Sequence, residues 1–210
     1  MKVLNLYAGI GGNRKLWEDV QVTAVEINPE IAKVYADYFP DDELVVGDAH
    51  EYLLKHYKEY DFIWSSPPCP SHSDARRMAT HRGQNDAIYP EMSLYQEIIL
   101  LKHYHKIGSK YVIENVRPYY EPLIPPSVKL GRHYFWNNFY IEQKKFKDNR
   151  VRHEDIKASS IVYGFDLGGY KIDNKIKILR NMVNPEIGLH FLNRARDIQT
   201  SEKIQQQTLF

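Results

Sequence analysis

The chain has 210 residues, a formal net charge of +1 and a single cysteine. Its length fits one domain with its own hydrophobic core, and one cysteine excludes an internal disulfide framework and a cysteine-rich zinc site. The apolar stretches are shorter than the ~18 residues that span a bilayer, so we expect a cytoplasmic protein without membrane contact.

The first two-thirds of the chain alternates strand-like and helix-like patterns. Apolar runs predict strands at residues 3–7, 22–26, 44–46, 62–64 and 111–113. The segments between them predict helices at residues 13–18, 29–38, 50–57 and 91–107. Strands separated by helices favour a parallel sheet with helices on both faces, which is an α/β fold.

After residue 126 the pattern changes. An aromatic run at 134–141 predicts paired antiparallel strands, residues 144–177 are polar, and a last helix is expected from Pro185 into a Gln-rich tail. We expect a cofactor-binding and catalytic core at 1–126, the end of the sheet with a minimal recognition region at 127–179, and a C-terminal helix completing the cofactor pocket at 180–210.

The ends of the first three strands indicate a pocket for an adenosine-containing cofactor. The first strand enters a Gly-Ile-Gly-Gly turn at 9–12, where a ligand can approach the main chain closely. Glu26 ends the second strand, where an acid can accept both ribose hydroxyls, and Asp48 ends the third. Arg14 replaces the third glycine of a dinucleotide fingerprint, which favours S-adenosylmethionine over a nicotinamide cofactor.

The ends of the fourth and fifth strands carry reactive side chains. Cys69 follows two prolines, and Glu114 and Asn115 end the fifth strand. Ligands of doubly wound sheets bind at the carboxyl ends of strands, so we expect Cys69 and Glu114 to face one pocket. A carboxyl there is either a structural hydrogen-bonder or a general acid whose pKa is raised by burial. Residues 70–90 are too long for an ordinary connection and predict a functional loop or lid.

In this order the motifs resemble those of the DNA (cytosine-5) methyltransferase family, in a compact, phage-like form. Residues 6–12 are similar to its first cofactor motif, 67–69 to its nucleophile motif, 114–116 to its base-anchoring motif and 180–185 to a late segment that closes the cofactor pocket. The resemblance implies a Rossmann-like, doubly wound, mostly parallel sheet of the S-adenosylmethionine-dependent methyltransferase type, with a small C-terminal extension.

The resemblance also implies a reaction. A methyl group passes from S-adenosylmethionine to C5 of cytosine in DNA while Cys69 is bonded to C6, and S-adenosylhomocysteine is the product. Glu114 holds N3 and the exocyclic amine, and Arg132 reaches the pyrimidine O2. A paired base buries these atoms, so the cytosine must flip out of the duplex. The reaction needs no metal, and a role such as restriction-modification would follow.

The site residues implied by the resemblance fall into three groups. The catalytic residues are Cys69, Glu114 and Arg132. The cofactor-binding residues are Tyr7, Ala8, Gly9, Gly11, Gly12, Glu26, Ile27, Asp48, Ala49, Pro67, Asn181 and Val183. The substrate-binding residues are Pro68, Ser73, Arg76, Arg77 and Asn115.

The chain departs from the family pattern in several places. Pro70 stands where the family usually has Gln, His133 takes the place of an arginine beside Arg132, and Arg180 replaces a glycine. Only residues 137–179 stand where the family usually inserts a full target-recognition domain. A reader of several base pairs typically buries ~1,000 Å² or more, so we expect short or relaxed specificity, or recognition supplied by a second chain.

Alternatives to DNA methylation stay open. Cytosine in RNA or in a free nucleotide is one, and a non-catalytic DNA- or cofactor-binding subunit of a two-chain methyltransferase is another. A nicotinamide-dependent oxidoreductase is disfavoured by Arg14. Basic clusters at 71–83 and 144–152 suit either phosphate contacts or a solvated surface. His72 and His81, in the predicted loop, are candidate substrate contacts.

Overall fold

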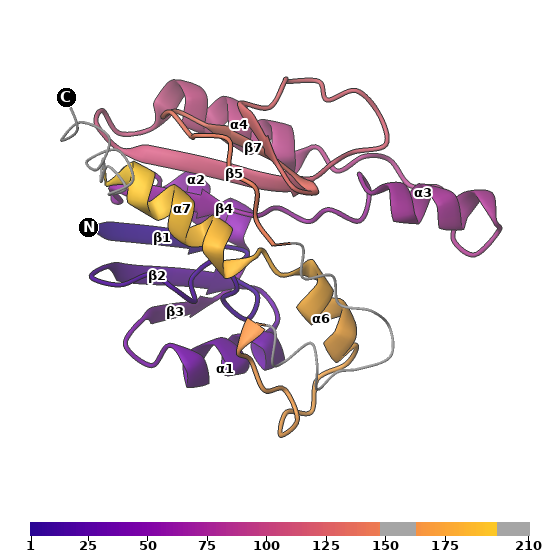
Figure 1. The fold of residues 1–210 in the computed structure, drawn as a ribbon, viewed down its shortest axis with the longest axis horizontal. Helices are drawn as coiled ribbons and strands as arrows, with labels where there is room; N and C mark the ends of the chain where they lie inside the picture. The colour runs from indigo at the N-terminus through magenta and orange to yellow at the C-terminus, as the bar shows by residue number, and fades with distance from the viewer. Residues whose placement is uncertain (148–162, 197–210) are drawn as a thin grey trace, which may run out of the picture.

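The computed structural model of the chain describes residues 1–147 and 163–196. Its central sheet has seven strands in the order β3-β2-β1-β4-β5-β7-β6 (Figure 1). The strands are β1 (Lys2–Leu6), β2 (Gln21–Glu26), β3 (Glu43–Val46), β4 (Phe62–Ser65), β5 (Lys110–Val116), β6 (Val128–Leu130) and β7 (His133–Asn137). The first five strands are parallel, and β7 is antiparallel to both β5 and β6.

Four of the six helices named below begin at a residue whose side chain caps the first turn. They are α1 (Pro29–Tyr38), α2 (Ala49–His56), α3 (Asp74–His81), α4 (Ser93–Tyr104), α6 (Lys175–Asn181) and α7 (Pro185–Ala195). α1 and α7 each start with a proline, and the preceding Asn28 or Asn184 accepts hydrogen bonds from free amides of the first turn. This is the usual N-terminal arrangement of Asn at the cap and Pro inside the helix.

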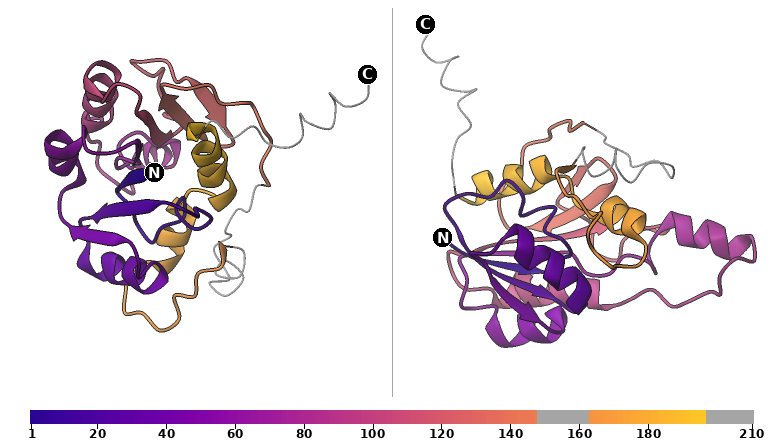
Figure 2. Two further views of the ribbon diagram at one scale, coloured as in Figure 1. Left: turned by 90° about the vertical axis from the view of Figure 1, so that its left-hand side faces the viewer. Right: turned by 90° about the horizontal axis from the view of Figure 1, so that it is seen from below.

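Helices cover both faces of the sheet, as Figure 2 shows. α7 packs on one face, where Phe62, Trp64 and Phe191 share a hydrophobic cluster. α2 and α4 pack on the opposite face through Leu53 and Leu101. The prediction of a doubly wound, mostly parallel α/β sheet is confirmed. None of the helices in the described ranges is long and apolar enough to cross a membrane.

Residues 13–18 do not form the helix expected for them. They run in turns that bury Trp17 against Trp64, with ring centroids 6.0 Å apart. α7 packs over these turns, because Trp17 and Phe191 belong to one hydrophobic cluster. It approaches so closely that a Cβ at Gly188 would lie 2.1 Å from the carbonyl oxygen of Asn13. The C-terminal helix therefore takes the place of a helix between β1 and β2.

Two helices of the structure were not predicted. α3 lies in residues 70–90, which we expected to be a loop, and α3 has no buried residue. α6 lies in the polar stretch 144–177 and extends to Asn181. Its sequence starts Lys-Ile-Lys-Ile, an alternation that indicates a strand more than a helix. The other predicted helices and strands of the parallel part are present, with bounds that differ by a few residues.

The antiparallel strands lie earlier in the chain than expected. Residues 138–141 are not in a strand, and the partner of β7 is β6, which precedes it. The division into parts at 1–126, 127–179 and 180–210 stays a prediction. Residues 148–152 of the second basic cluster and the Gln-rich tail lie outside the described residues.

Replacing Phe191 by Ala tests how much α7 contributes to stability. Phe191 is fully buried, and its ring centroid lies 4.7 Å from that of Phe135 and 5.5 Å from that of Trp64. We expect Phe191→Ala to lower the free energy of unfolding by about 3–5 kcal/mol, because the cavity cannot collapse against the sheet. Urea unfolding measures the change. Ile107→Ala, at a side chain that is 97% exposed, is the control and should stay within about 0.5 kcal/mol.

Candidate active site

One cavity of about 330 Å³ opens at the carboxyl ends of β1, β4 and β5. Its size is typical of a small-molecule site. It brings together predicted residues from the turn after β1, the turn after β4, β5, the β6–β7 hairpin and the end of α6. These are Tyr7, Ala8, Gly9, Gly12, Pro67, Pro68, Cys69, Glu114, Arg132, Asn181 and Val183. Cys69 and Glu114 therefore open into the same cavity.

The turn after β1, which we call the cofactor turn (residues 7–12), is held by backbone geometry that needs glycine. Gly9 has a φ of +55°, and a Cβ there would meet nothing within 4 Å, so its main chain is open to a ligand. A Cβ at Gly12 would lie 2.8 Å from the carbonyl oxygen of Val183. Glycine at this position lets the segment after α6 close over the turn.

Glu26 is buried at the end of β2 and is oriented by two backbone amides. Its Oε2 accepts from Gly9 at 2.9 Å, and its Oε1 accepts from Asn28 at 2.9 Å. The carboxylate is thus fixed beside the cofactor turn. This buried, oriented acid and the open main chain at Gly9 fit a ligand that carries a ribose.

Several predicted cofactor residues lie outside the cavity lining. Gly11, Glu26, Ile27, Asp48 and Ala49 are at the same edge of the sheet but do not line the cavity. Asp48 caps α2, because its Oδ1 accepts from the amides of His50 at 2.8 Å and Glu51 at 3.0 Å. The side chain of Ile27 is 65% exposed.

Arg14 turns away from the cavity. Its guanidinium forms an ion pair with Asp42 at 2.8 Å and lies over the ring of Phe39. The dinucleotide fingerprint has a glycine at this position, which lets the following helix pack closely on the strand. Here turns follow instead of a helix, and Arg14 pairs with Asp42, so the dinucleotide arrangement is not formed.

The turn after β4, which we call the nucleophile turn (residues 66–70), is held from below by Asn115. The side-chain amide of Asn115 is buried and donates to the carbonyl oxygen of Pro67 at 2.9 Å. The amide of His72 donates to the carbonyl oxygen of Cys69 at 3.0 Å. Asn115, a predicted substrate residue, thus supports the turn from the interior.

The thiol of Cys69 is half-buried and protonated at neutral pH. Burial raises the pKa of Cys69 to about 11, and the Glu114 carboxyl adds to the rise. The cations Arg132 and Lys177 lower the pKa of this thiol by a smaller amount. At neutral pH only a very small fraction of this thiol is therefore ionised.

Glu114 is buried on β5 and exchanges its proton near neutral pH. Burial raises the pKa of Glu114 to about 7, against partial opposition from a hydrogen bond with Ser66 and from the charge of Arg132. The hydroxyl of Ser66 accepts from the indole N–H of Trp64 at 2.8 Å, so its own proton is free to point at Glu114. A carboxyl of this kind can donate or accept a hydrogen bond at pH 7.

His133 lies diagonally across the β5–β7 pair from Glu114, since its direct partner in the register is Val116. Its Nε2 lies 3.6 Å from Oε1 of Glu114, and both side chains are buried. Burial lowers the pKa of His133 to about 3, so the ring is neutral at pH 7. His133 also lines the cavity. The side chain of Arg132 lines it as well, is exposed, and donates to the carbonyl oxygen of Arg180.

The remaining predicted substrate residues surround α3. Ser73 caps this helix, and its Oγ accepts from the amide of Arg76 at 3.2 Å. Arg76 and Arg77 line a second cavity of about 260 Å³ together with His81. Arg77 is also 2.9 Å from Asp74. The structure therefore separates these residues from the cavity that holds Cys69. His72 is fully buried, and its Nδ1 lies 2.6 Å from the hydroxyl of Tyr120.

Sequence reasoning missed several residues that line the first cavity. Lys177 and Ile178 come from α6, and Ile31 comes from the first turn of α1. The apolar residues at 178, 179 and 182 have helical spacing, but the strand-like alternation at 175–178 obscures this signal for α6. Nothing in the local sequence of Ile31 marks it as part of a site. In the described part of the chain, no group of three His, Cys, Asp or Glu side chains could hold a metal ion.

Comparisons with known proteins give one family and one fold. Residues 1–120 match the family model described as C-5 cytosine-specific DNA methylase. No curated protein matches the chain. The solved structure of the Entamoeba histolytica methyltransferase EhMeth is 14% identical with a TM-score of 0.58, over 95% of this chain and 99% of that one. This likeness shows the Rossmann-like methyltransferase fold.

Two further solved structures match only in part. A mutant of the Spodoptera frugiperda protein DNMT2 is 25% identical with a TM-score of 0.39, over 55% of this chain and 35% of that one. A SAM-dependent methyltransferase from Agrobacterium tumefaciens is 13% identical with a TM-score of 0.40, over 57% of this chain and 40% of that one. The chain thus spans less than half the length of either protein.

Replacing Glu114 by Gln tests the burial of this carboxyl. Its pKa is about 7 in the folded protein against an ordinary 4.5, so the folded state keeps the proton after the unfolded state has lost it. The contribution of this proton to the free energy of unfolding is complete below pH 4.5 and is lost as the pH rises through 7. We expect the stability of the native chain to fall by up to about 3 kcal/mol across this window, relative to Glu114→Gln.

Urea unfolding of both proteins between about pH 4 and 8 measures this difference. Glu121→Gln, at an exposed carboxylate, is the matched control and should follow the native chain at every pH. A gap between the native chain and Glu114→Gln that does not change with pH would contradict the expectation.

Proposed function

Because the chain belongs to the C-5 cytosine-specific DNA methylase family, we propose that it transfers a methyl group from S-adenosylmethionine to C5 of cytosine in DNA. The observation that carries the proposal is that Cys69 and Glu114 line one cavity. Attack on a pyrimidine ring needs a nucleophile on one side of the ring and a carboxyl on the other.

Cys69 is the nucleophile. Its sulfur bonds to C6 of the cytosine. The electrons of the C5–C6 double bond then shift toward C4 and N3, and C5 becomes nucleophilic, as in an enamine. The thiol proton must first pass to solvent, and because burial raises the pKa of Cys69 to about 11, this step is unfavourable at neutral pH in the ligand-free cavity. The nearby charges of Arg132 and Lys177 favour the thiolate.

Glu114 holds the opposite edge of the ring. In its protonated form it donates to N3, which stabilises the negative charge that enters the ring when the sulfur adds. The carbonyl oxygen of its carboxyl accepts from the exocyclic amine. Burial, which raises the pKa of Glu114 to about 7, keeps the protonated form available near neutral pH. The neutral ring of His133, 3.6 Å away, adds no competing charge.

The cofactor turn would hold S-adenosylmethionine. The open main chain at Gly9 and the oriented carboxylate of Glu26 fit its methionine and ribose parts. Asp48 lies at the next strand end, where an acid can accept from the adenine amine. When bound, the cofactor supplies the electrophilic methyl group. Afterwards the C5 proton leaves, the C5–C6 double bond forms again, and Cys69 departs from C6 as a thiolate.

A flipped cytosine requires contacts to the rest of the nucleic acid. α3 projects from the body of the molecule beside the nucleophile turn (Figures 1 and 2), and Arg76 and Arg77 lie on it. Arginines on such a helix suit phosphates, which position a duplex without reading its sequence. Only residues 137–179 stand where the family usually inserts a target-recognition domain, so specificity would be short or relaxed, or a second chain would supply it.

Fluorocytosine trapping tests the proposed reaction. A fluorine at C5 cannot leave as a proton does, so the bond between Cys69 and C6 persists after methyl transfer. We expect the native chain, S-adenosylmethionine and a 5-fluorocytosine duplex to give a covalent protein–DNA species, seen by mass spectrometry at Cys69. Cys69→Ala should give none, because the chain has no other cysteine.

A methyl-transfer assay separates the alternative substrates. Radiolabel from the methyl group of S-adenosylmethionine is followed into duplex DNA, tRNA and dCMP in parallel. Label in tRNA or dCMP but not in DNA would move the substrate class to RNA or a nucleotide. No label in any of them, with a Cys69→Ala protein that keeps its biological effect, would indicate a non-catalytic subunit.

Charge removal on α3 tests the nucleic-acid contact. We expect the double change Arg76→Ala and Arg77→Ala to weaken duplex binding and to reduce the slope of log K against log salt by about 1.8, since each phosphate that is no longer neutralised accounts for about 0.9. Fluorescence anisotropy at several salt concentrations measures both. Lys55→Ala, at an exposed lysine of α2, is the control. A slope that is equal in all three proteins would remove α3 from the interface.

A further inference from the structure

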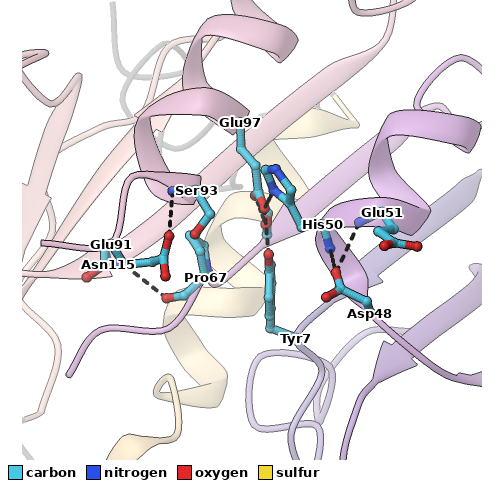
Figure 3. A network of polar contacts seen from close by, with 10 residues as sticks. Tyr7, Asp48, His50, Glu51, Pro67, Glu91, Ser93, Glu97 and Asn115 are labelled. Atoms are coloured by element: carbon cyan, nitrogen blue, oxygen red, sulfur yellow. Dashed lines mark hydrogen bonds and ion pairs between the residues drawn. The ribbon is translucent and has the colours of Figure 1, made fainter. Parts of the chain in front are cut away.

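Glu97 is a fully buried carboxyl on α4 for which the proposed reaction has no use. Its Oε1 accepts from the hydroxyl of Tyr7 at 2.7 Å, and its Oε2 accepts from the hydroxyl of Ser65 at 2.5 Å. The Nδ1 of His50 lies 3.0 Å from Oε1. Figure 3 shows Tyr7 reaching the Glu97 carboxyl from below and the ring of His50 lying beside it. A buried carboxyl is tolerated only with such partners, because its desolvation is costly.

Two of these partners lead directly into the candidate active site. β1 and β4 are neighbours, and Leu6 is paired with Ser65 in their register. Tyr7 is thus the first residue of the cofactor turn, and Ser65 is the last residue before the nucleophile turn. One carboxyl therefore holds the starting points of both turns, with one oxygen for each.

The backbone of Tyr7 shows why such a hold is needed. Its φ is +55°, a left-handed conformation that a bulky residue rarely adopts. Because the phenol is tied to Glu97, the ring cannot swing out and let this backbone relax. Burial and the Glu97 carboxyl both raise the pKa of Tyr7, so the phenol stays a donor at all ordinary pH values.

The third partner connects α2. The pKa of His50 is raised, chiefly by its hydrogen bond to Glu97, and this half-exposed ring lies 3.0 Å from the buried carboxyl. Asp48, at the cap of the same helix, lies at the edge where we place the adenine. The network thus joins the cofactor side of the cavity to the nucleophile side.

We propose that Glu97 is a positioning residue for methyl transfer, whose carboxyl fixes the cofactor turn and the nucleophile turn at their working separation. The inference rests on the proposed function, because only a reaction between a ligand on one turn and a ligand on the other depends on that separation. Glu97 acts through Tyr7 and Ser65 and touches neither substrate nor cofactor.

The experiment compares Glu97→Gln with Glu51→Gln, a change of the same charge at an exposed residue of α2. The side-chain amide that Glu97→Gln introduces presents N–H groups where a hydroxyl needs an acceptor. We expect Glu97→Gln to weaken S-adenosylmethionine binding and to slow formation of the fluorocytosine adduct, each by about tenfold. Isothermal calorimetry and timed adduct assays measure the two effects, and Glu51→Gln should match the native chain in both.

Single-hydroxyl changes separate the two sides of the network. Tyr7→Phe should weaken cofactor binding about fivefold with a smaller effect on the adduct rate, and Ser65→Ala should do the reverse. In a Glu97→Ala background neither change should add a further effect, since both hydroxyls act through this carboxyl. Additive effects, or native values in Glu97→Gln, would overturn the proposal.

Alkylation of Cys69 by iodoacetamide supplies a measurement that needs neither cofactor nor nucleic acid. A loosened nucleophile turn exposes the thiol, so Glu97→Gln and Ser65→Ala should react about threefold faster than the native chain, and Glu51→Gln should not. If the native chain failed to bind S-adenosylmethionine, the proposed function would fail, while the alkylation rates would still decide the role of Glu97. Equal rates in folded protein would contradict that role.

Discussion

The registers of three neighbouring parallel strands determine where the reactive groups meet. Leu6 of β1 pairs with Ser65 of β4, and Ser65 pairs with Ile113 of β5. The next residue along each strand therefore emerges at one level, and these residues are Tyr7, Ser66 and Glu114. A shift of one residue would turn every following side chain to the other face. The cofactor turn, the nucleophile turn and the buried carboxyl are thus brought together by strand pairing before any side-chain contact is considered.

Burial gives the candidate active site its chemical character. The same low-polarity surroundings raise the pKa of both the Cys69 thiol and the Glu114 carboxyl, so the thiol is protonated and the carboxyl partly so when the cavity is free of ligand. An uncharged pair costs less to bury than an ion and its counterion. In the proposed reaction, the thiol would stay unreactive until a ring that accepts a hydrogen bond from Glu114 is present. Reactivity would then be coupled to occupancy of the cavity.

Much of the fold follows from local patterns. The strand and helix alternation up to β5 and the order of the short motifs predicted the sheet and the meeting of Cys69 with Glu114. The rest depends on tertiary packing. No local signal shows that α7 covers the face next to residues 13–18, or that Ile31 reaches the cavity. The sequence predicted ligand contacts for Asp48 and Asn115, but Asp48 caps α2 and Asn115 supports the nucleophile turn. Both structural roles use the polar atoms that ligand binding would use, so sequence alone does not separate them. α3, with its Ser73 cap, could have been predicted.

The contact between Gly12 and Val183 has a consequence for biosynthesis. It joins the first loop of the chain to a segment near its other end, and α7 then seats Gly188 against Asn13. Contacts so distant in sequence are slow to form, because the intervening chain must be ordered first. Residues 182–183 line the cavity that holds Cys69. This part of the lining is missing until the ribosome has synthesised them. A nascent chain would expose Trp17 and its apolar neighbours until α7 has been synthesised, and exposed apolar surface of this kind is prone to aggregation.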